Sequence, residues 1–214
     1  MIRSTTALLL LLTLSLLSGC VIGRRTVDAP MPQTAGTGGK GEFYLGSIED
    51  NRVFLDDPGQ PSTPSVDGDL GETPESVLVT LIGRQRNGYG MAMGDVALPE
   101  GETVMSRTRQ LLEEGLRRRG YTLSDNPNAP DSASVEIDKY WAWVTPGFFT
   151  ISLESQIECT LTIKTPEGIR TVLVKGYGLA EDLGANDYLW RTSYGNAYTA
   201  FLEDFDKQMT EQGL

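Results

Sequence analysis

The amino-acid sequence predicts an α+β domain, in which an antiparallel or mixed sheet ends in a C-terminal β-meander and two helices pack on one of its faces. Three observations support this fold class. Apolar and polar residues alternate through residues 134–179, which is the period of half-buried strands. Apolar residues recur at helical spacing in residues 103–119 and 192–211. The 214 residues, with 39% hydrophobic side chains and 24 glycines, are sufficient for the core of one such domain.

The first part of the predicted sheet is a strand over residues 42–54, with a bulge or break at Gly46. A hairpin is expected from residues 77–84 and 89–97. The dipeptide Asn87-Gly88 between them tolerates the left-handed backbone conformations that a tight turn requires.

The first predicted helix spans residues 103–119 and ends at Gly120, which suits the residue after a helix C-terminus. One face of it carries Val104, Thr108, Leu111, Leu112, Gly115 and Leu116. Arg117, Arg118 and Arg119 lie where cations stabilise the negative helix end, and an anion site formed by the same three arginines stays an alternative. Residues 121–123 are expected to form a short strand.

The C-terminal part is expected to form three longer strands, at residues 134–144, 148–164 and 169–179, with turns at Pro146-Gly147 and Pro166-Glu167-Gly168. The last helix follows at residues 192–211. Its apolar positions at three- and four-residue spacing are Tyr194, Ala197, Tyr198, Phe201, Leu202, Phe205 and Met209.

The N-terminus has the pattern of a secretory signal peptide over residues 1–19, with a charged Arg3 before an apolar run that is too short to span a membrane. The run ends in Leu17-Ser18-Gly19-Cys20, which resembles the lipobox of bacterial lipoproteins. That resemblance implies cleavage between Gly19 and Cys20 and a Cys20 that carries acyl chains such as palmitate. Two or more acyl chains hold a protein stably on a bilayer.

The resemblance also implies a location. Lipoproteins that stay at the inner membrane often carry Asp after the acylated Cys, whereas Val21 follows here, so we expect the outer membrane with the domain facing the periplasm. Residues 20–41 contain many Gly and Pro residues and little to bury, and we expect them to be a flexible tether. Residues 42–214 are then a single periplasmic domain.

Charge and composition exclude several classes of function. The net charge of −11 opposes binding to nucleic acid or to an anionic bilayer through a basic surface. The absence of histidine removes imidazole metal ligands and the Ser-His and Cys-His nucleophile pairs. No cofactor or metal is expected, and the glycine-rich residues 36–41 lack the spacing of a nucleotide loop.

Three further features receive structural interpretations. Residues 55–74 form a long loop whose Asp67-Gly68-Asp69-Leu70-Gly71-Glu72 lacks EF-hand spacing; we expect a solvated acidic loop, with calcium binding as the alternative. Cys159 falls in an alternating apolar run and is expected to be buried and inert. Glu154 and Glu158 share a polar strand face about 13 Å apart, too far for a glycosidase pair.

The candidate partner patch lies in the predicted hairpin of residues 134–164. Val135, Ile137, Trp141 and Trp143 share one parity and are expected to face the core. This leaves Tyr140 and Val144 on the opposite face, with Phe148 and Phe149 at the turn. Exposed apolar patches often mark interaction sites, although coverage by the long loop or by helix ends stays the alternative.

The chain resembles the YajG family of bacterial lipoproteins. The residues that carry the likeness are Cys20, the helix segment RQLLEEGLRRRGY at residues 109–121, and the order of meander and helix that ends near Met209. The resemblance covers residues 77–209 and implies a periplasm-facing α+β lipoprotein without established enzymatic activity. It implies no site residue beyond Cys20.

These observations predict a non-catalytic, lipid-anchored envelope protein whose domain acts through contacts with another envelope protein. Two alternatives stay open. One is a binder of lipid or glycan fragments in a pocket between sheet and helices. The other is a carboxylate-based hydrolase of the cell envelope, which needs two acids that converge in a cleft.

Overall fold

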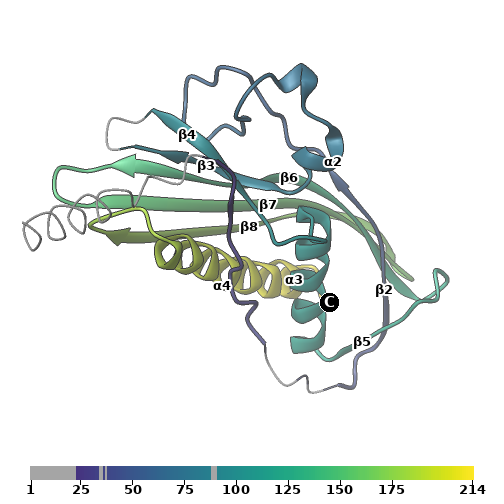
Figure 1. The fold of residues 1–214 in the computed structure, drawn as a ribbon. Coiled ribbons are helices and arrows are strands. Elements are labelled where there is room, and N and C mark those ends of the chain that lie inside the picture. Colours follow the sequence, from purple (N-terminus) through teal and green to yellow (C-terminus); the bar gives the residue numbers. More distant parts are fainter. Residues whose placement is uncertain (1–22, 34–35, 37, 88–90) are drawn as a thin grey trace, which may run out of the picture.

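The computed structural model of the chain describes residues 23–33, 36, 38–87 and 91–214. In these residues one mixed sheet of eight strands is combined with three α-helices (Figure 1). The two longer helices, α3 (Val104–Arg118) and α4 (Asp187–Glu211), lie on the same face of the sheet and bury its apolar side chains. The predicted α+β class, the meander and the two covering helices are confirmed.

The strands follow one another as β1 (Arg25–Thr26), β2 (Gly41–Asp50), β3 (Leu81–Arg86), β4 (Ala92–Ala97), β5 (Tyr121–Leu123), β6 (Asp131–Pro146), β7 (Ile151–Thr165) and β8 (Gly168–Asp182). The long strand β6 is the centre of the sheet. On one side it pairs with β7, which pairs with β8, and these three strands form the antiparallel meander. On its other side, β2 lies parallel to the first half of β6 and β3 parallel to the second half, which makes the sheet mixed.

Two bulges decide which side chains face the helices. The first lies in β2 between Leu45 and Ile48, as the sequence predicts at Gly46. The second lies in β6 between Ile137 and Lys139 and is not predicted. One extra residue reverses the alternation of the strand. Tyr140 therefore joins Ile137 on the helix face, and the expectation that the tryptophans share that face is wrong.

Helix α3 begins and ends as its sequence indicates. Its N-cap Thr103 accepts a hydrogen bond from the Ser106 backbone N–H, and Ser106 accepts one from the Thr103 backbone N–H, so the two residues form a capping box. Gly120 after the last turn has a φ of 87°, a conformation that favours glycine.

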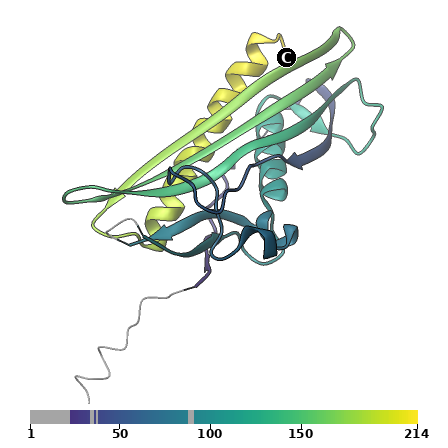
Figure 2. The same ribbon diagram turned by 90° about the horizontal axis from the view of Figure 1, so that it is seen from above.

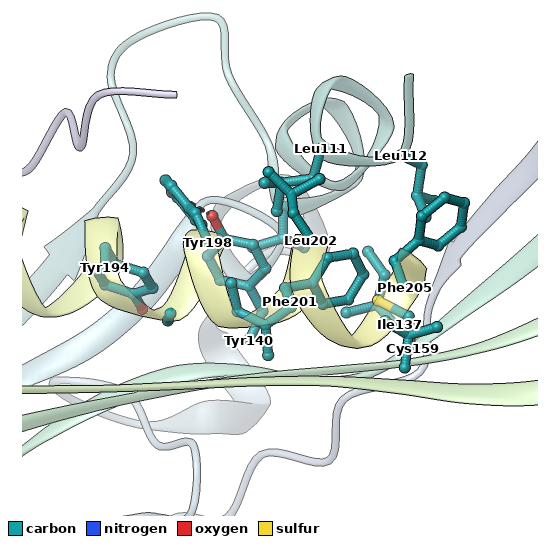
Figure 3. Close-up of a cluster of buried hydrophobic side chains, with 14 of the residues drawn as sticks. Leu111, Leu112, Ile137, Tyr140, Cys159, Tyr194, Tyr198, Phe201, Leu202 and Phe205 are labelled. Atoms are coloured by element: carbon teal, nitrogen blue, oxygen red, sulfur yellow. Dashed lines mark hydrogen bonds between the residues drawn. The ribbon is translucent and has the colours of Figure 1, made fainter. Parts of the chain in front are cut away.

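Helix α4 supplies the largest aromatic part of the core. Figure 3 shows Tyr194, Tyr198 and Phe201 of α4 beside Tyr140 of β6, and all four side chains are buried. The Tyr140 and Tyr198 hydroxyls lie 2.6 Å apart and share a hydrogen bond, while the Tyr194 hydroxyl donates to the carbonyl of Ile82. The apolar face predicted for this helix is confirmed.

Glycines on β8 allow α4 to lie directly against the strand. A Cβ atom on Gly178 would lie 2.0 Å from the Ser193 carbonyl oxygen, and one on Gly176 would lie 2.3 Å from that of Ala197. Both distances are shorter than any real Cβ contact. The helix and the sheet therefore approach to a separation that any larger residue at these two positions would prevent.

The opposite face of the sheet is covered in part by the segment between β2 and β3. This segment contains the short helix α2 (Glu75–Leu78) and packs Val66 against Trp141 and Leu81. Arg52 holds it in place. The buried guanidinium donates to the carbonyls of Leu78, Leu81 and Tyr140 at 2.9, 2.6 and 2.9 Å.

The expected hairpin has different limits from those predicted. Residues 75–78 are helical, the strand pair starts at Leu81, and β3 and β4 are antiparallel as expected. Gly88 of the predicted turn lies outside the described residues. Asn87 and Met91 flank it, and the Asn87 backbone N–H donates to the Met91 carbonyl at 2.9 Å.

Part of the expected tether lies on the domain. Strand β1 pairs in parallel with β4, and the side chains of Val27 and Ala29 are buried in the main core. Arg107 of α3 forms an ion pair with Asp28 at 2.5 Å. Residues 23–33 therefore differ from the free linker that their composition predicts, because backbone pairing and two small apolar side chains are enough to dock them.

We expect Gly178→Ala to destabilise the fold by about 1–3 kcal/mol, since the added methyl group would force α4 away from β8. Gly195→Ala is the matched control: it lies within α4, its Cβ would meet nothing within 4 Å, and it should stabilise by up to about 1 kcal/mol. Denaturant unfolding of both variants measures the difference. Equal stabilities would contradict the proposed close approach.

Candidate functional site

The predicted anchor cannot be placed in this fold. Gly19 and Cys20 lie outside the described residues, and so does the predicted signal peptide. Among the residues that the structure describes, no helix is long and apolar enough to span a membrane. The acylation of Cys20 therefore stays a prediction from the lipobox resemblance.

Two residues of the predicted partner patch are part of the core. Tyr140 and Val144 are buried on the helix face, and burial together with the neighbouring tyrosines raises the pKa of Tyr140 well above its ordinary value. The β6 bulge accounts for the correction, because it moves both side chains from the outer face to the inner one. Neither residue can contact a partner.

The other two residues of that patch are exposed. Phe148 and Phe149 lie at the turn of the β6–β7 hairpin, with exposed fractions of 92% and 82%. Their rings contact each other edge to face, with centroids 4.5 Å apart. Figure 2 shows that this hairpin extends beyond the neighbouring strands at its end of the sheet. Sequence reasoning found these two residues because they lie in a turn next to Pro146-Gly147.

The outer face of the meander carries a hydrogen-bonded cluster centred on Glu154. Its carboxylate accepts hydrogen bonds from the Thr145 hydroxyl at 2.8 Å, the Tyr177 hydroxyl at 2.9 Å and the Trp143 indole N–H at 3.2 Å. Glu158 accepts from the Lys175 ammonium at 3.1 Å. Both carboxylates are therefore held by neighbouring donors, which fits the structural interpretation given to them.

Beside this cluster, β8 presents apolar side chains to solvent. Leu173, Tyr177 and Leu179 lie on its outer face and are each about half exposed, and the exposed Lys175 lies on the same face between Leu173 and Tyr177. The residues of the other parity, from Val172 to Ala180, are buried on the helix face. The free edge of the strand is partly closed, because Asp204 of α4 accepts from the Lys175 backbone N–H and Asn196 donates to the Leu179 carbonyl. Such capping hinders the addition of a further strand and leaves the face as the accessible surface.

Other candidates from the sequence have structural roles. Cys159 is fully buried, and burial raises the pKa of its thiol. Glu114 forms ion pairs with Arg117 and Arg118, and Arg119 pairs with Asp206 of α4. These partners favour the structural interpretation of the arginines over an anion site.

The acidic loop is held by hydrogen bonds within it and by an ion pair with β3. Asp67 forms an ion pair with Arg84 at 3.0 Å, Asp69 caps the backbone N–H of Gly71, and Asp56 accepts from the Leu70 N–H. In residues 38–87 and the other described ranges, no group of three or more acidic or cysteine ligands is close enough to hold a metal ion.

The ligand-binding alternative from the sequence needs a pocket between the sheet and the helices. Around Phe205 and Leu116 the side chains leave no room for a water molecule. A cavity of about 270 Å³ lies instead beside the first turn of α4, lined by Arg25, Gln85, Arg86, Met93, Ile151, Ala185 and Trp190. The indole N–H of Trp190 is buried and has no hydrogen-bond partner in the part of the chain described.

Two acids face one shallow hollow at the other end of the sheet. Asp131 and Glu167 both line it, and burial followed by the charge of Glu167 raises the pKa of Asp131. The Glu167 side chain is largely open to water and pairs with Arg170 at 3.6 Å. The hydrolase alternative stays a prediction without a further observation in its favour.

No protein-family model and no curated protein matches the sequence. Solved structures that resemble the fold include a Xanthomonas campestris protein described under the family DUF330, with a TM-score of 0.45 and 6% identity over 91% of this chain and 98% of that chain. An uncharacterized protein has a TM-score of 0.33 and 8% identity over 89% of this chain and 95% of that chain. A hypothetical protein of Chlamydia trachomatis has a TM-score of 0.30 and 10% identity over 80% of this chain and 97% of that chain. At such low scores the likenesses carry no statement about function.

We expect Glu154→Gln to lower the pKa of Tyr177 toward its ordinary value of about 10. Burial and the hydrogen bond to the Glu154 carboxylate raise this pKa to about 12, so loss of the negative charge makes the phenolate easier to form. NMR titration of ring-labelled tyrosine measures the change. Glu158→Gln is the control and should leave the Tyr177 titration unchanged; the same result for Glu154→Gln would disprove the interaction.

Proposed function

We propose that the chain is a lipid-anchored, non-catalytic protein of the bacterial envelope, which acts through contact with another envelope protein. Leu17-Ser18-Gly19-Cys20 supports the anchor, since a lipobox directs acyl chains to the cysteine. Val21 after Cys20 supports the outer membrane with the domain in the periplasm. We further infer that the chain is related to the YajG lipoproteins, on the likeness of residues 77–209.

The observation that carries the contact proposal is the outer face of β7 and β8. Half-exposed Leu173, Tyr177 and Leu179 lie there on a long, regular strand instead of a loop. A rigid surface loses little conformational entropy when it binds, and aromatic residues at such positions dominate interface energies. The face therefore combines the apolar content and the rigidity that a protein-binding surface needs.

The charge of this face indicates the chemistry of the partner. Acidic side chains on it are Glu136, Asp138, Glu154, Glu158 and Glu181, and basic ones are Lys139, Lys164 and Lys175. A surface with more acidic than basic side chains, and with apolar side chains on β8 on both sides of Lys175, complements a partner that offers basic and apolar side chains together. The Glu154 carboxylate already accepts hydrogen bonds from three side chains, so a role in a binding surface suits it better than a role in proton transfer.

A photoreactive residue in place of Tyr177 should crosslink to one envelope protein in whole cells, and Leu179→Ser introduced beside it should abolish the adduct. Because both side chains are half exposed, these changes should leave the melting temperature almost unchanged. Val53, which is exposed on the loop before α2, is the control position and should give no adduct. The same crosslinked adducts from positions 177 and 53 would contradict the proposal that the outer face of β7 and β8 binds the partner.

The anchor has a separate test. Cys20→Ser should abolish metabolic labelling with palmitate and move the protein from the membrane pellet to the soluble fraction, because several acyl chains are needed for stable binding. Cys159→Ala is the matched control, since it removes the other of the two cysteines, a buried one. Unchanged labelling and sedimentation of Cys20→Ser would exclude the anchor.

A second candidate function is the binding of a lipid or glycan fragment in the cavity beside α4. The cavity of about 270 Å³ favours it, because apolar Met93, Ile151 and Trp190 line it together with the polar Arg25 and Gln85 side chains. Native mass spectrometry of the protein released gently from membranes should then show a bound mass that Trp190→Phe loses. A bare mass for the unaltered protein would remove this candidate.

A further inference from the structure

Exposed apolar side chains gather at one end of the molecule. The C-terminal end of β3, the N-terminal end of β4, the β6–β7 hairpin and the β8–α4 connection all lie at this end, at the left of Figure 1. The strand registers give the same result, because Arg86 pairs with Ala92 and Ile151 pairs with both Pro146 and Asp182. The large apolar side chains exposed there are Met91, Phe148, Phe149, Leu183 and Tyr188, and we call this set the apolar tip.

The β6–β7 hairpin of the apolar tip differs in charge from the turns at the opposite end of the sheet. In the β6–β7 hairpin no charged residue occurs from Val144 to Leu153, so the most projecting part of the apolar tip is uncharged. At the opposite end, the turns have the sequences Thr165-Pro166-Glu167-Gly168 and Asp125-Asn126-Pro127-Asn128. Insertion of this hairpin into a low-dielectric environment therefore requires no desolvation of a charge within it, whereas a turn at the opposite end would lose solvation of a carboxylate. The β8–α4 connection and the ends of the elements it joins carry Glu181, Asp182 and Asp187, so we expect only the hairpin to insert while these carboxylates stay in water.

The N-terminal segment enters the domain at the same end. Strand β1 runs parallel to β4 with Arg25 beside Val96, so the chain direction toward the N-terminus is the direction toward Ala92 and the apolar tip. The Gln85 amide donates to the Gly23 carbonyl at 2.8 Å, and this hydrogen bond holds Gly23 beside β3. Arg25 also lines the same cavity as Ile151 and Ala185, which belong to or adjoin the connections at the tip.

We propose that the apolar tip contacts the surface of the lipid bilayer, with Phe148 and Phe149 inserted at the level of the head groups. The inference deepens the proposed function and rests on the acylation of Cys20. From Cys20 to Gly23 the chain advances three residues, which span about 11 Å at most. An acylated Cys20 would therefore hold the apolar tip close to the bilayer, and aromatic side chains favour that interfacial region.

This arrangement orients the rest of the domain. The long strands β6, β7 and β8 run away from the apolar tip, so they would rise from the membrane with α4 beside them (Figures 1 and 2). The outer face with Leu173, Tyr177 and Leu179 would then point sideways into the periplasm. A free linker of some twenty residues would instead give a mean reach of about 25 Å and no fixed orientation.

The test uses the full mature protein, purified from membranes and reconstituted in vesicles of phosphatidylethanolamine and phosphatidylglycerol. Phe149→Cys carries an environment-sensitive fluorophore, and Ile169→Cys at the opposite end of the sheet, also exposed, carries the same fluorophore as a control. Cys159 is fully buried and should remain unlabelled. An acylated Cys20 has no free thiol, so the unaltered protein should take up no fluorophore.

We expect the probe at position 149 to shift its emission to shorter wavelength and to be quenched by lipids with a nitroxide on the acyl chain, and the probe at position 169 to do neither. Equal, water-like behaviour of both probes in vesicle-bound protein would overturn the contact while leaving the anchor intact. A blue shift at position 149 that lipid nitroxides do not quench would assign the apolar tip to a protein contact and also overturn it. Labelling of Cys20 in the unaltered protein would overturn both the anchor and the contact.

Discussion

The close contact between α4 and β8 is the constraint on which the rest of the fold depends. Gly176 and Gly178 leave room for the helix backbone at two successive positions of one strand face. The helix then buries a row of aromatic side chains against the meander and closes the inner face of the sheet. The inner face of the sheet is consequently closed, and contact with another molecule is left to the outer face, the loops, the two ends and the solvent-facing sides of the helices.

Sequence periodicity predicts most of this architecture, and it fails where one residue breaks the period. The alternation of β7 and β8 and the helical spacing of α3 and α4 fix their buried faces correctly. The bulge after Ile137 reverses β6, and Tyr140 and Val144 become buried for that reason. A usable signal exists: the five residues 140–144 are all apolar, which is typical of a strand covered on both faces.

The candidate site is only partly predictable for a related reason. Phe148 and Phe149 follow a turn signal, so local sequence makes them candidates for exposure, and the structure decides for exposure against coverage by the loop or by helix ends. The docking of residues 23–33 depends on backbone pairing with β4, and the cavity beside α4 joins Arg25, Ile151 and Trp190 from distant parts of the chain. No local pattern marks such contacts, because each partner alone has an ordinary composition.

In this account, the lipid anchor and the apolar tip contact the membrane, and the outer face of β7 and β8 contacts the partner protein. The anchor is the premise of this arrangement, because it places the domain at the membrane. Intact mass spectrometry of the protein extracted from bacterial membranes tests it most directly. We predict a chain that begins at Cys20 and is heavier than its unmodified sequence by a diacylglyceryl group and one further acyl chain. A chain that begins at any other residue, or one with an unmodified Cys20, would contradict the account.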